Sequence, residues 1–394
     1  MEKANEKIDE IMQQLSNGIK DVMTSERYKE FLNVMGSFYN YSFNNQILIM
    51  KQMPAATNIA SFTFWKKLER HVKRGEKGIK ILAPNINKVT ESIIVKDKEG
   101  KPVMVDGRPL TEDVISHKLT GFRIAYVFDV SQTSGKALPT LTTELHGTSP
   151  TAEKLLHTLE KVIPFPIETV DFSQRFPKHP TAKGCFNFTD QTIYLNEKNE
   201  PIQNVKTLIH EYAHGIEHQD SELSKMDKEI QAESTAYVVS NYFGIDTSEY
   251  SFDYVSGWAY GKDVKEIQTI MENVRTTIKG IIEQVNYELV QEHLREEIET
   301  MLKKADIEPT EKLVNNILEI DTLAGKSLSI DELQSEQIPD AISESNRNVI
   351  GEKIKKLKPH LKSSKKMKQK KIQSSKKAMP SKITTMAAMQ LQVR

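Results

Sequence analysis

The chain of 394 residues contains little cysteine and no long apolar run. Its single cysteine, Cys185, excludes a disulfide framework within the chain and is typical of a reducing compartment. No stretch approaches the roughly 18 consecutive apolar residues that a membrane-spanning helix needs. The first residues, MEKANEKIDEIMQQL, are charged from position 2 and lack the apolar segment of a secretory signal. We therefore expect a cytoplasmic protein that does not bind a membrane.

The net charge is zero, but basic and acidic residues are segregated along the chain. Residues 353–394 contain 13 lysines, one arginine and no acidic residue, which leaves 40 basic against 54 acidic residues in 1–352, a balance of −14. We expect disorder in this Lys-rich tail, because it has too few apolar residues to fold alone. The tail either adds salt-sensitive DNA affinity or is only a solvated extension.

Hydrophobic periodicity and turn-forming residues divide the chain into five parts. They predict an α+β fold with two α+β domains, at 1–135 and 151–300. Residues 136–150 are rich in Ser, Thr, Gly and Pro and form the expected linker. An acidic helical segment at 301–352 and the disordered tail at 353–394 follow.

The strongest chemical signal is the sequence HEYAH at 210–214. On a helix, His210 and His214 lie on one face, so both imidazoles can bind one metal ion. Glu211 projects beside that face, where its carboxylate can act as catalytic general base toward a zinc-activated water. The motif predicts a Zn²⁺ site of the HExxH metallopeptidase type. The alternative is a chance motif on a solvated helix.

A catalytic zinc site needs a third protein ligand and an open position. Glu229 and Glu233 lie four residues apart on a predicted helix, so one can bind the ion while the other accepts a hydrogen bond from a ligand histidine. Three other residues are weaker candidates. Asp220 and Glu222 lie in a predicted turn, and His218 lies further along the helix.

Three further residues near the predicted site have both a chemical and a structural interpretation. Cys185 has no partner at metal-ligand spacing, so we expect a buried thiol. Tyr237 and Tyr260 are possible donors to an oxyanion. A tyrosine downstream of such a motif is more often a packing residue.

The sequence EIQAE at 229–233, followed by Ala236, resembles the ExxA(N/D/E)xxA segment of zincin families that include the ImmA/IrrE-like peptidases. The resemblance implies a zincin-like, gluzincin-type metallopeptidase fold, with Glu229 as the third ligand and Glu233 supporting the site. It also implies that the strand at 192–195 is an edge strand above the zinc, where an extended peptide can bind by strand addition.

A basic and aromatic stretch in the first domain predicts DNA binding. Between positions 66 and 80, seven cations stand against two acids, beside three aromatic residues at 62, 64 and 65. Single strands bind such surfaces through cations along the backbone and rings that stack on bases. An ordinary solvated helix and turn with core aromatics is the alternative. The candidate DNA-binding residues are Phe64, Trp65, Lys66, Lys67, Arg70, Lys73, Arg74 and Lys77.

Four segments are similar to the N-terminal domain of the antirestriction ArdC family and the related LtrC-like proteins: YSFNNQ (41–46), FWKK (64–67), KRGEKGI (73–79) and FDVSQT (128–133). The similarity covers most of residues 5–140 and, with the peptidase-like part, about the first 290 residues. It implies a single-stranded-DNA-binding domain fused to a zincin domain, in a protein that shields incoming conjugative DNA from restriction. Duplex DNA is the expected weaker ligand. Residues 44–46 either contact nucleic acid or cap a helix.

Two other functions remain open. One is a regulatory zinc metallopeptidase that cleaves a specific partner such as a repressor, as the ImmA/IrrE resemblance suggests. The other is an accessory module of a conjugative primase, because similar N-terminal domains occur there. The sequence shows no primase-type acidic metal cluster, and it identifies neither a protein substrate nor an oligomeric state.

Overall fold

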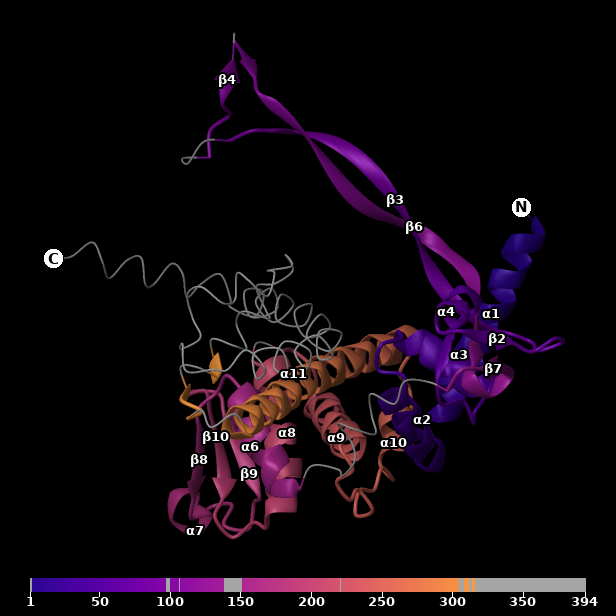
Figure 1. Ribbon diagram of the computed structural model, residues 1–394. Helices are drawn as coiled ribbons and strands as arrows, with labels where there is room; N and C mark the ends of the chain where they lie inside the picture. Colours follow the sequence, from indigo (N-terminus) through magenta and orange to yellow (C-terminus); the bar gives the residue numbers. More distant parts are fainter. Residues whose placement is uncertain are drawn as a thin grey trace. The chain divides into compact units, whose positions relative to one another are not determined.

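The computed structural model describes residues 2–96, 100–105, 107–137, 151–219, 221–304, 308–311 and 314–315 (Figure 1). These residues mix helices and strands, which confirms the predicted α+β class. Most of the predicted linker and acidic segment, and all of the Lys-rich tail, lie outside the described residues. None of the helices described has both the length and the apolar character that a bilayer crossing requires.

Packing divides the chain into two units, Met1–Pro139 with Phe252–Glu272, and Thr140–Ser251 with Asn273–Arg394. The first unit opens with three helices: α1 (Glu2–Val22), α2 (Ser25–Ser37) and α3 (Phe43–Gln52). Ser42 caps α3, since its side chain accepts a hydrogen bond from the Asn45 N–H at 3.4 Å. The apolar stripe of α3 is buried, which gives the following sheet a surface to pack on.

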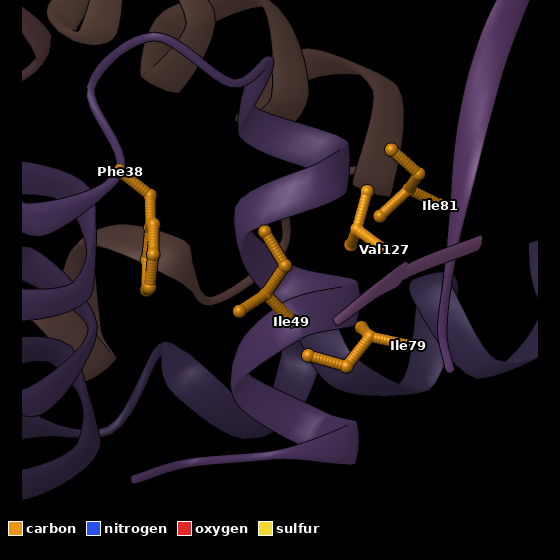
Figure 2. Close-up of a cluster of buried hydrophobic side chains, with 5 residues drawn as sticks. All are labelled: Phe38, Ile49, Ile79, Ile81 and Val127. Atoms are coloured by element: carbon orange, nitrogen blue, oxygen red, sulfur yellow. The ribbon is translucent and has the colours of Figure 1, made fainter. Parts of the chain in front are cut away.

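A three-stranded antiparallel sheet packs on α3, in the order β1 (Ile59–Ser61), β6 (Thr111–Asp129) and β3 (Ile79–Ile94). Figure 2 shows the contact, in which Ile79, Ile81 and Val127 of the sheet form a cluster with Ile49 and Phe38. Strand β3 runs through Pro84 and continues to Ile94. Pro84 is tolerated because β3 lies at the edge of its sheet, where a missing N–H costs no ladder bond.

Smaller elements complete this part of the first unit: α4 (Phe62–Lys67), β2 (Arg70–Val72), β4 (Met104–Val105), β5 (Arg108–Pro109), η1 (Val130–Gln132) and β7 (Thr133–Gly135). Asp129, at the end of β6, holds this region together. Its carboxylate accepts hydrogen bonds from the backbone N–H groups of Thr57, Asn58 and Ser131, at 2.8 to 2.9 Å. The side chain is 1% exposed, so these bonds satisfy a buried charge.

Residues Phe252–Glu272 pack with the first unit, although the sequence places them in the second domain. They contain α10 (Val255–Ala259) and the first turns of α11 (Val264–Lys304). Glu272 accepts a hydrogen bond from the Phe43 N–H at 2.8 Å, and Gln268 donates to the Asn44 side chain at 3.0 Å. Such pairings join positions more than 200 residues apart, so local sequence patterns do not reveal them.

The polar residues of α3 have structural roles. The Asn45 side chain exchanges two hydrogen bonds with the backbone of Leu82, at 3.0 and 2.8 Å. The Gln46 side chain is buried and donates to the Phe38 carbonyl at 2.9 Å. The side chains at 44–46 are thus paired within the protein, and the cap of α3 is Ser42, so neither interpretation of these residues describes their contacts.

The second unit contains α6 (Ala152–Val162), β8 (Ile167–Val170), α7 (Phe172–Arg175), β9 (Gly184–Asn187), β10 (Thr192–Asn196), α8 (Pro201–Glu217) and α9 (Lys225–Tyr242). Its sheet has the order β8-β10-β9, with β10 parallel to β8 and antiparallel to β9. The expectation that 192–195 is an edge strand is therefore wrong. All five residues of β10 are buried at the centre of the sheet, and β9 is the edge strand that packs on α8.

Candidate metal centre

The predicted metal helix is α8, which begins with Pro201 at its first turn and buries an apolar face. Leu208, Ile209 and Ala213 are fully buried around the HExxH motif, so the polar side chains project from a fixed helix. The next helix, α9, begins at a capping box in which Ser224 and Asp227 bond to each other's backbone N–H. These two helices supply the residues of the site.

Three side chains converge between α8 and α9. The Nε2 atoms of His210 and His214 lie 3.1 Å apart, and Oε2 of Glu229 lies 3.7 Å and 3.9 Å from them. Ligands about 2.05 Å from a tetrahedral zinc ion are separated by about 3.3 Å. The spacing of the three groups, whose ligand atoms all lie within 4.8 Å of one another, therefore fits one small divalent ion.

Glu233 contacts the other side of the same cluster. Its Oε1 lies 3.7 Å from Nδ1 of His210, whereas Glu229 approaches the Nε2 atoms. The helical spacing of the two glutamates left open which one faces the metal. In this arrangement Glu229 is placed with the ligand atoms, and Glu233 faces Nδ1 of His210, whose N–H can donate a hydrogen bond to it.

His218, a weaker candidate ligand in the sequence, lies behind His214 and not among the three converging ligand atoms. Its Nδ1 lies 2.8 Å from Nδ1 of His214, and its Nε2 lies 2.9 Å from Oε1 of Gln231 on α9. His218 is 2% exposed and Gln231 is fully buried. The only signal in the sequence is the four-residue spacing of 210, 214 and 218. The contact with Gln231 depends on how α9 packs against α8.

Glu211 lies beside the cluster and contacts the edge strand. Its Oε2 accepts a hydrogen bond from the Phe186 N–H of β9 at 2.7 Å. Burial raises the pKa of Glu211 to about 8. The hydrogen bond from Phe186 opposes this rise, and the nearby carboxylates of Glu229 and Glu233 add to it. A carboxyl group with such a pKa can hold and release a proton near neutral pH, as a general base requires.

The close approach of β9 to α8 requires a glycine. A Cβ atom added to Gly184 would lie 2.4 Å from the Thr207 side chain and 2.9 Å from the Tyr194 carbonyl oxygen. Any side chain at position 184 would therefore push the strand away from the helix. The contact between Phe186 and Glu211 depends on this short separation.

Both candidate histidine ligands are half-buried and neutral. Burial lowers the pKa of His210 to about 4, and burial followed by the neighbouring histidines lowers the pKa of His214 to about 3. Neutral imidazole is the form that binds a metal ion. The protein therefore pays no cost of deprotonation at these two positions near neutral pH.

The remaining predicted residues of the second domain lie outside the cluster. Asp220 is not among the described residues, and Glu222 is exposed away from the three ligand atoms. Cys185 lies on β9, where burial raises its pKa to about 11, in keeping with an inert thiol. Tyr237 is a core residue at 2% exposure, and Tyr260 is 91% exposed within the first unit.

Two of the predicted DNA-binding residues belong to the fold. Trp65 is 2% exposed, and its Nε1 donates to the Phe128 carbonyl at 2.8 Å, so the expectation that its ring stacks on a base is wrong. The Arg70 guanidinium donates to the side chain and backbone of Thr133 and to the Lys136 carbonyl. Trp65 thereby holds α4 on β6, and Arg70 holds β2 on β7.

The other predicted DNA-binding residues are available on the surface. Phe64 is 51% exposed, and Lys73 donates to the Ser131 carbonyl at 2.8 Å while remaining exposed. The further exposed cations of this set are Lys66, Lys67, Arg74 and Lys77.

A comparison with known proteins finds a family match for part of the first unit. Residues 2–111 match the family model for the N-terminal domain of anti-restriction factor ArdC. This amino-terminal part of the chain is ArdC-like. The uncharacterized protein pXO2-81 of Bacillus anthracis is 26% identical over 334 residues, which cover 78% of this chain and 56% of that protein. The chain thus spans little more than half the length of this relative.

Two solved structures are also similar to the chain. They are the metal-free and the Mn(II)-bound crystal structures of the antirestriction ArdC protein from plasmid R388. Their sequence identities are 17% and 16%, and their TM-scores are 0.39 and 0.38. Each covers 62% of this chain and 85% of the R388 protein.

Proposed function

We propose that this protein is a single-stranded-DNA-binding, antirestriction-type protein of a conjugative element, whose second unit binds one Zn²⁺ ion. The match of residues 2–111 to the ArdC N-terminal domain carries the first half of this proposal. The exposed cations between Lys66 and Lys77 support it, because phosphate contacts supply most of the affinity of such proteins. Duplex DNA is the weaker ligand.

The DNA-binding half is tested with labelled single- and double-stranded oligonucleotides across a salt series. Replacing Lys66 and Lys67 by Glu weakens single-strand binding. It also reduces the slope of the logarithm of the binding constant against the logarithm of the salt concentration, by about 0.7 for each lost phosphate contact. Reversing Lys178 and Lys183, two exposed lysines of the second unit, is the matched control. Equal affinity for both kinds of DNA, with no effect of the first variant, contradicts the proposal.

The metal half rests on the convergence of His210, His214 and Glu229. Two imidazoles and one carboxylate are a typical donor set for zinc. A zinc ion held there would supply a Lewis acid that activates water. Glu211 is positioned to take the proton, and Phe186 fixes the orientation of its carboxylate.

Metal analysis of purified variants tests the ligand assignment. His210→Ala, His214→Ala and Glu229→Gln lose zinc, whereas Glu233→Gln retains it with reduced affinity. Parallel titrations with Zn²⁺ and Mn²⁺ establish which ion the site prefers. Zinc retained at the wild-type ratio in His210→Ala or Glu229→Gln refutes the assignment.

A second candidate function is a regulatory metallopeptidase. The observation that favours it is the edge strand β9 beside Glu211, since an extended peptide can add to such a strand. Glu211→Gln then keeps zinc but abolishes cleavage of a partner protein. If that variant retains full biological activity, proteolysis is not the function and the zinc stabilises the fold. A primase-accessory role has no supporting feature within the part of the chain that the structure describes.

A further inference from the structure

The hairpin of β3 and β6 has two different faces at its base. Ile79, Ile81 and Val127 point to one face and pack on α3 (Figure 2). Successive side chains of a strand alternate between faces, so the neighbours of Val127 at positions 126 and 128 lie on the opposite face. Beyond the base, the hairpin extends past the helices of the first unit (Figure 1), and its side chains become largely exposed.

The face opposite α3 carries a row of aromatic rings. Phe122 and Tyr126 lie on this face of β6, with the partly buried Ile124 between them, and each ring is 51% exposed. Phe128 continues the row, and its ring centroid lies 6.4 Å from that of Phe62, which is 55% exposed. We call Phe62, Phe128, Tyr126 and Phe122 the aromatic row. Adjoining exposed rings of this kind mark an interaction surface.

The local structure fixes the aromatic row. A Cβ atom added to Gly78 would lie 3.0 Å from the Phe128 ring and 3.1 Å from Cβ of Tyr126. The backbone can therefore pass this close to the two residues only because position 78 is a glycine. The buried Trp65 binds the Phe128 carbonyl and thereby fixes α4, with Phe62 at its start, against β6. The rings are held on ordered elements before any ligand binds.

The charge along the hairpin changes with distance from the helices. Residues 79–90 and 115–128 contain four exposed cations and no acidic residue. Acidic residues begin at Glu91 on β3 and at Asp113 and Glu112 on β6. The half of the hairpin that carries the aromatic row is therefore the positively charged half. The four cations are Lys80, Lys88, Lys118 and Arg123.

The register places cations on the same face as the rings. Lys80 is paired with Tyr126, and Pro84 with Phe122, so Lys80 and the two rings share a face. The pairing shifts between Asn85 and Ile86, where Thr120 is an extra residue on β6. The alternation of β3 continues through this bulge, so Lys88 lies on the same face as Lys80. Rings flanked by cations complement a strand that has exposed bases and a charged backbone. A peptide would need no such charge.

We propose that a single nucleic-acid strand lies along the base of this hairpin, with bases stacked on the aromatic row and phosphates against Lys80 and Lys88. The proposal rests on the single-strand binding proposed above and assigns it a path. That path continues from the exposed cations near Lys67 and Lys77 onto the hairpin. It ends where the acidic residues begin, so the outer hairpin is outside the contact.

The experiment measures fluorescence anisotropy of a labelled oligothymidylate and of an abasic strand of the same length, with the full-length protein. Phe122→Ala and Tyr126→Ala each weaken oligothymidylate binding by roughly tenfold, because each removes one stacking platform. Neither changes binding of the abasic strand, which has phosphates but no bases. Tyr126→Trp keeps a ring and retains wild-type affinity.

The matched controls are Ile93→Ala and Val114→Ala, which remove exposed apolar side chains (48% and 38%) from the opposite face of the outer hairpin. They bind both strands as wild type does. A wild-type protein that binds no oligonucleotide overturns the proposed function itself. A wild-type protein that binds, and loses affinity in the Lys66/Lys67 reversal but not in Phe122→Ala and Tyr126→Ala, overturns the path alone. Loss of self-association instead of DNA binding in these two variants also overturns it, in favour of a contact between two copies of the chain.

Discussion

The Nδ1 atoms of His214 and His218 lie 2.8 Å apart on successive turns of α8. One of the two atoms must carry the hydrogen at this distance. Because His214 turns its Nε2 toward His210 and Glu229, its Nδ1 is the donor and His218 the acceptor. Nε2 of His218 then donates to Gln231. His218 therefore fixes both the tautomer and the orientation of His214.

His218→Ala is expected to lower metal affinity by about 10- to 100-fold, because His214 loses the partner that orients its ring. Competition against a chromophoric chelator measures the affinity, and the ratio of metal to protein at saturation stays the same. His157→Ala is the control, since this exposed histidine pairs with Glu160 away from the cluster. Wild-type affinity in His218→Ala contradicts the positioning role.

Trp65 distinguishes the core from the DNA surface within one short helix. Trp65→Ala removes a ring that is 2% exposed and is expected to cost about 3–5 kcal/mol of unfolding free energy in the first unit. Phe64→Ala removes a ring that is 51% exposed and leaves stability nearly unchanged. Urea unfolding followed by circular dichroism measures both. A stable Trp65→Ala protein with impaired DNA binding would restore the stacking role that the burial argues against.

The convergence of His210 and His214 could be predicted from the sequence because it is local. The four-residue spacing of His210 and His214 is a property of any helix, and it places both imidazoles on one face whatever surrounds them. Spacing alone could not choose between Glu229 and Glu233, and the choice came from a family resemblance. The hydrogen-bond relay from His214 through His218 to Gln231 could not be predicted, since it depends on the packing of α9 against α8.

Long-range pairing explains where the sequence failed. The order of strands decides that β10 is central and β9 is the edge, and nothing within residues 192–196 encodes that order. Trp65 stands in a basic stretch that favours a surface position, but its burial is decided by contact with β6, some 60 residues away. The packing of Phe252–Glu272 with the first unit likewise depends on contacts between residues far apart in the sequence. The α+β class was predictable because it depends only on the local periods of the pattern.

Asp129 makes the first unit sensitive to acid. Burial by itself would raise its pKa, but hydrogen bonds from Ser131, Thr57 and Asn58 outweigh burial and hold the pKa below the ordinary value of 3.8. A lowered folded pKa contributes stability above the unfolded pKa, and this contribution is lost as the pH falls through the folded value. Asp129→Asn is therefore expected to lose about 1.5–3 kcal/mol at pH 7, and the loss shrinks progressively as the pH falls below 3.8.

Tryptophan fluorescence reports this effect selectively, because the chain has two tryptophans, Trp65 and Trp258, and both lie in the first unit. Unfolding in urea at each pH gives the difference between wild type and Asp129→Asn. Asp21→Asn is the control, since Asp21 is an exposed carboxylate with surface ion pairs to Lys51 and Arg27. A difference between Asp129→Asn and wild type that does not shrink in acid would show that the charge of Asp129 is not what the hydrogen bonds stabilise.

Glu217, in the last turn of α8, is expected to make the second unit less stable as the pH rises. Its side chain is 8% exposed, and burial raises its pKa to about 7 from 4.5. A raised folded pKa means that stability is complete below the unfolded pKa and is lost as the pH rises through the folded value. Glu217→Gln removes the charge, so at pH 8 it is expected to be more stable than wild type by about 2–3 kcal/mol, and at pH 4 equally stable.

Thermal unfolding by far-ultraviolet circular dichroism across this range checks the prediction for Glu217. Glu222→Gln provides the comparison, because Glu222 is exposed and removing its charge relieves no burial of a carboxylate. A Glu217→Gln protein less stable than wild type at pH 8 would mean that the buried carboxylate is charged and has a favourable partner. The candidates are Thr277, whose side-chain hydrogen bond acts to lower the pKa of Glu217, and His218, whose Nε2 lies 3.8 Å from Oε2 of Glu217. The double variant Glu217→Gln, His218→Ala separates these cases, because the cost of the first change disappears only if the two side chains act as a pair.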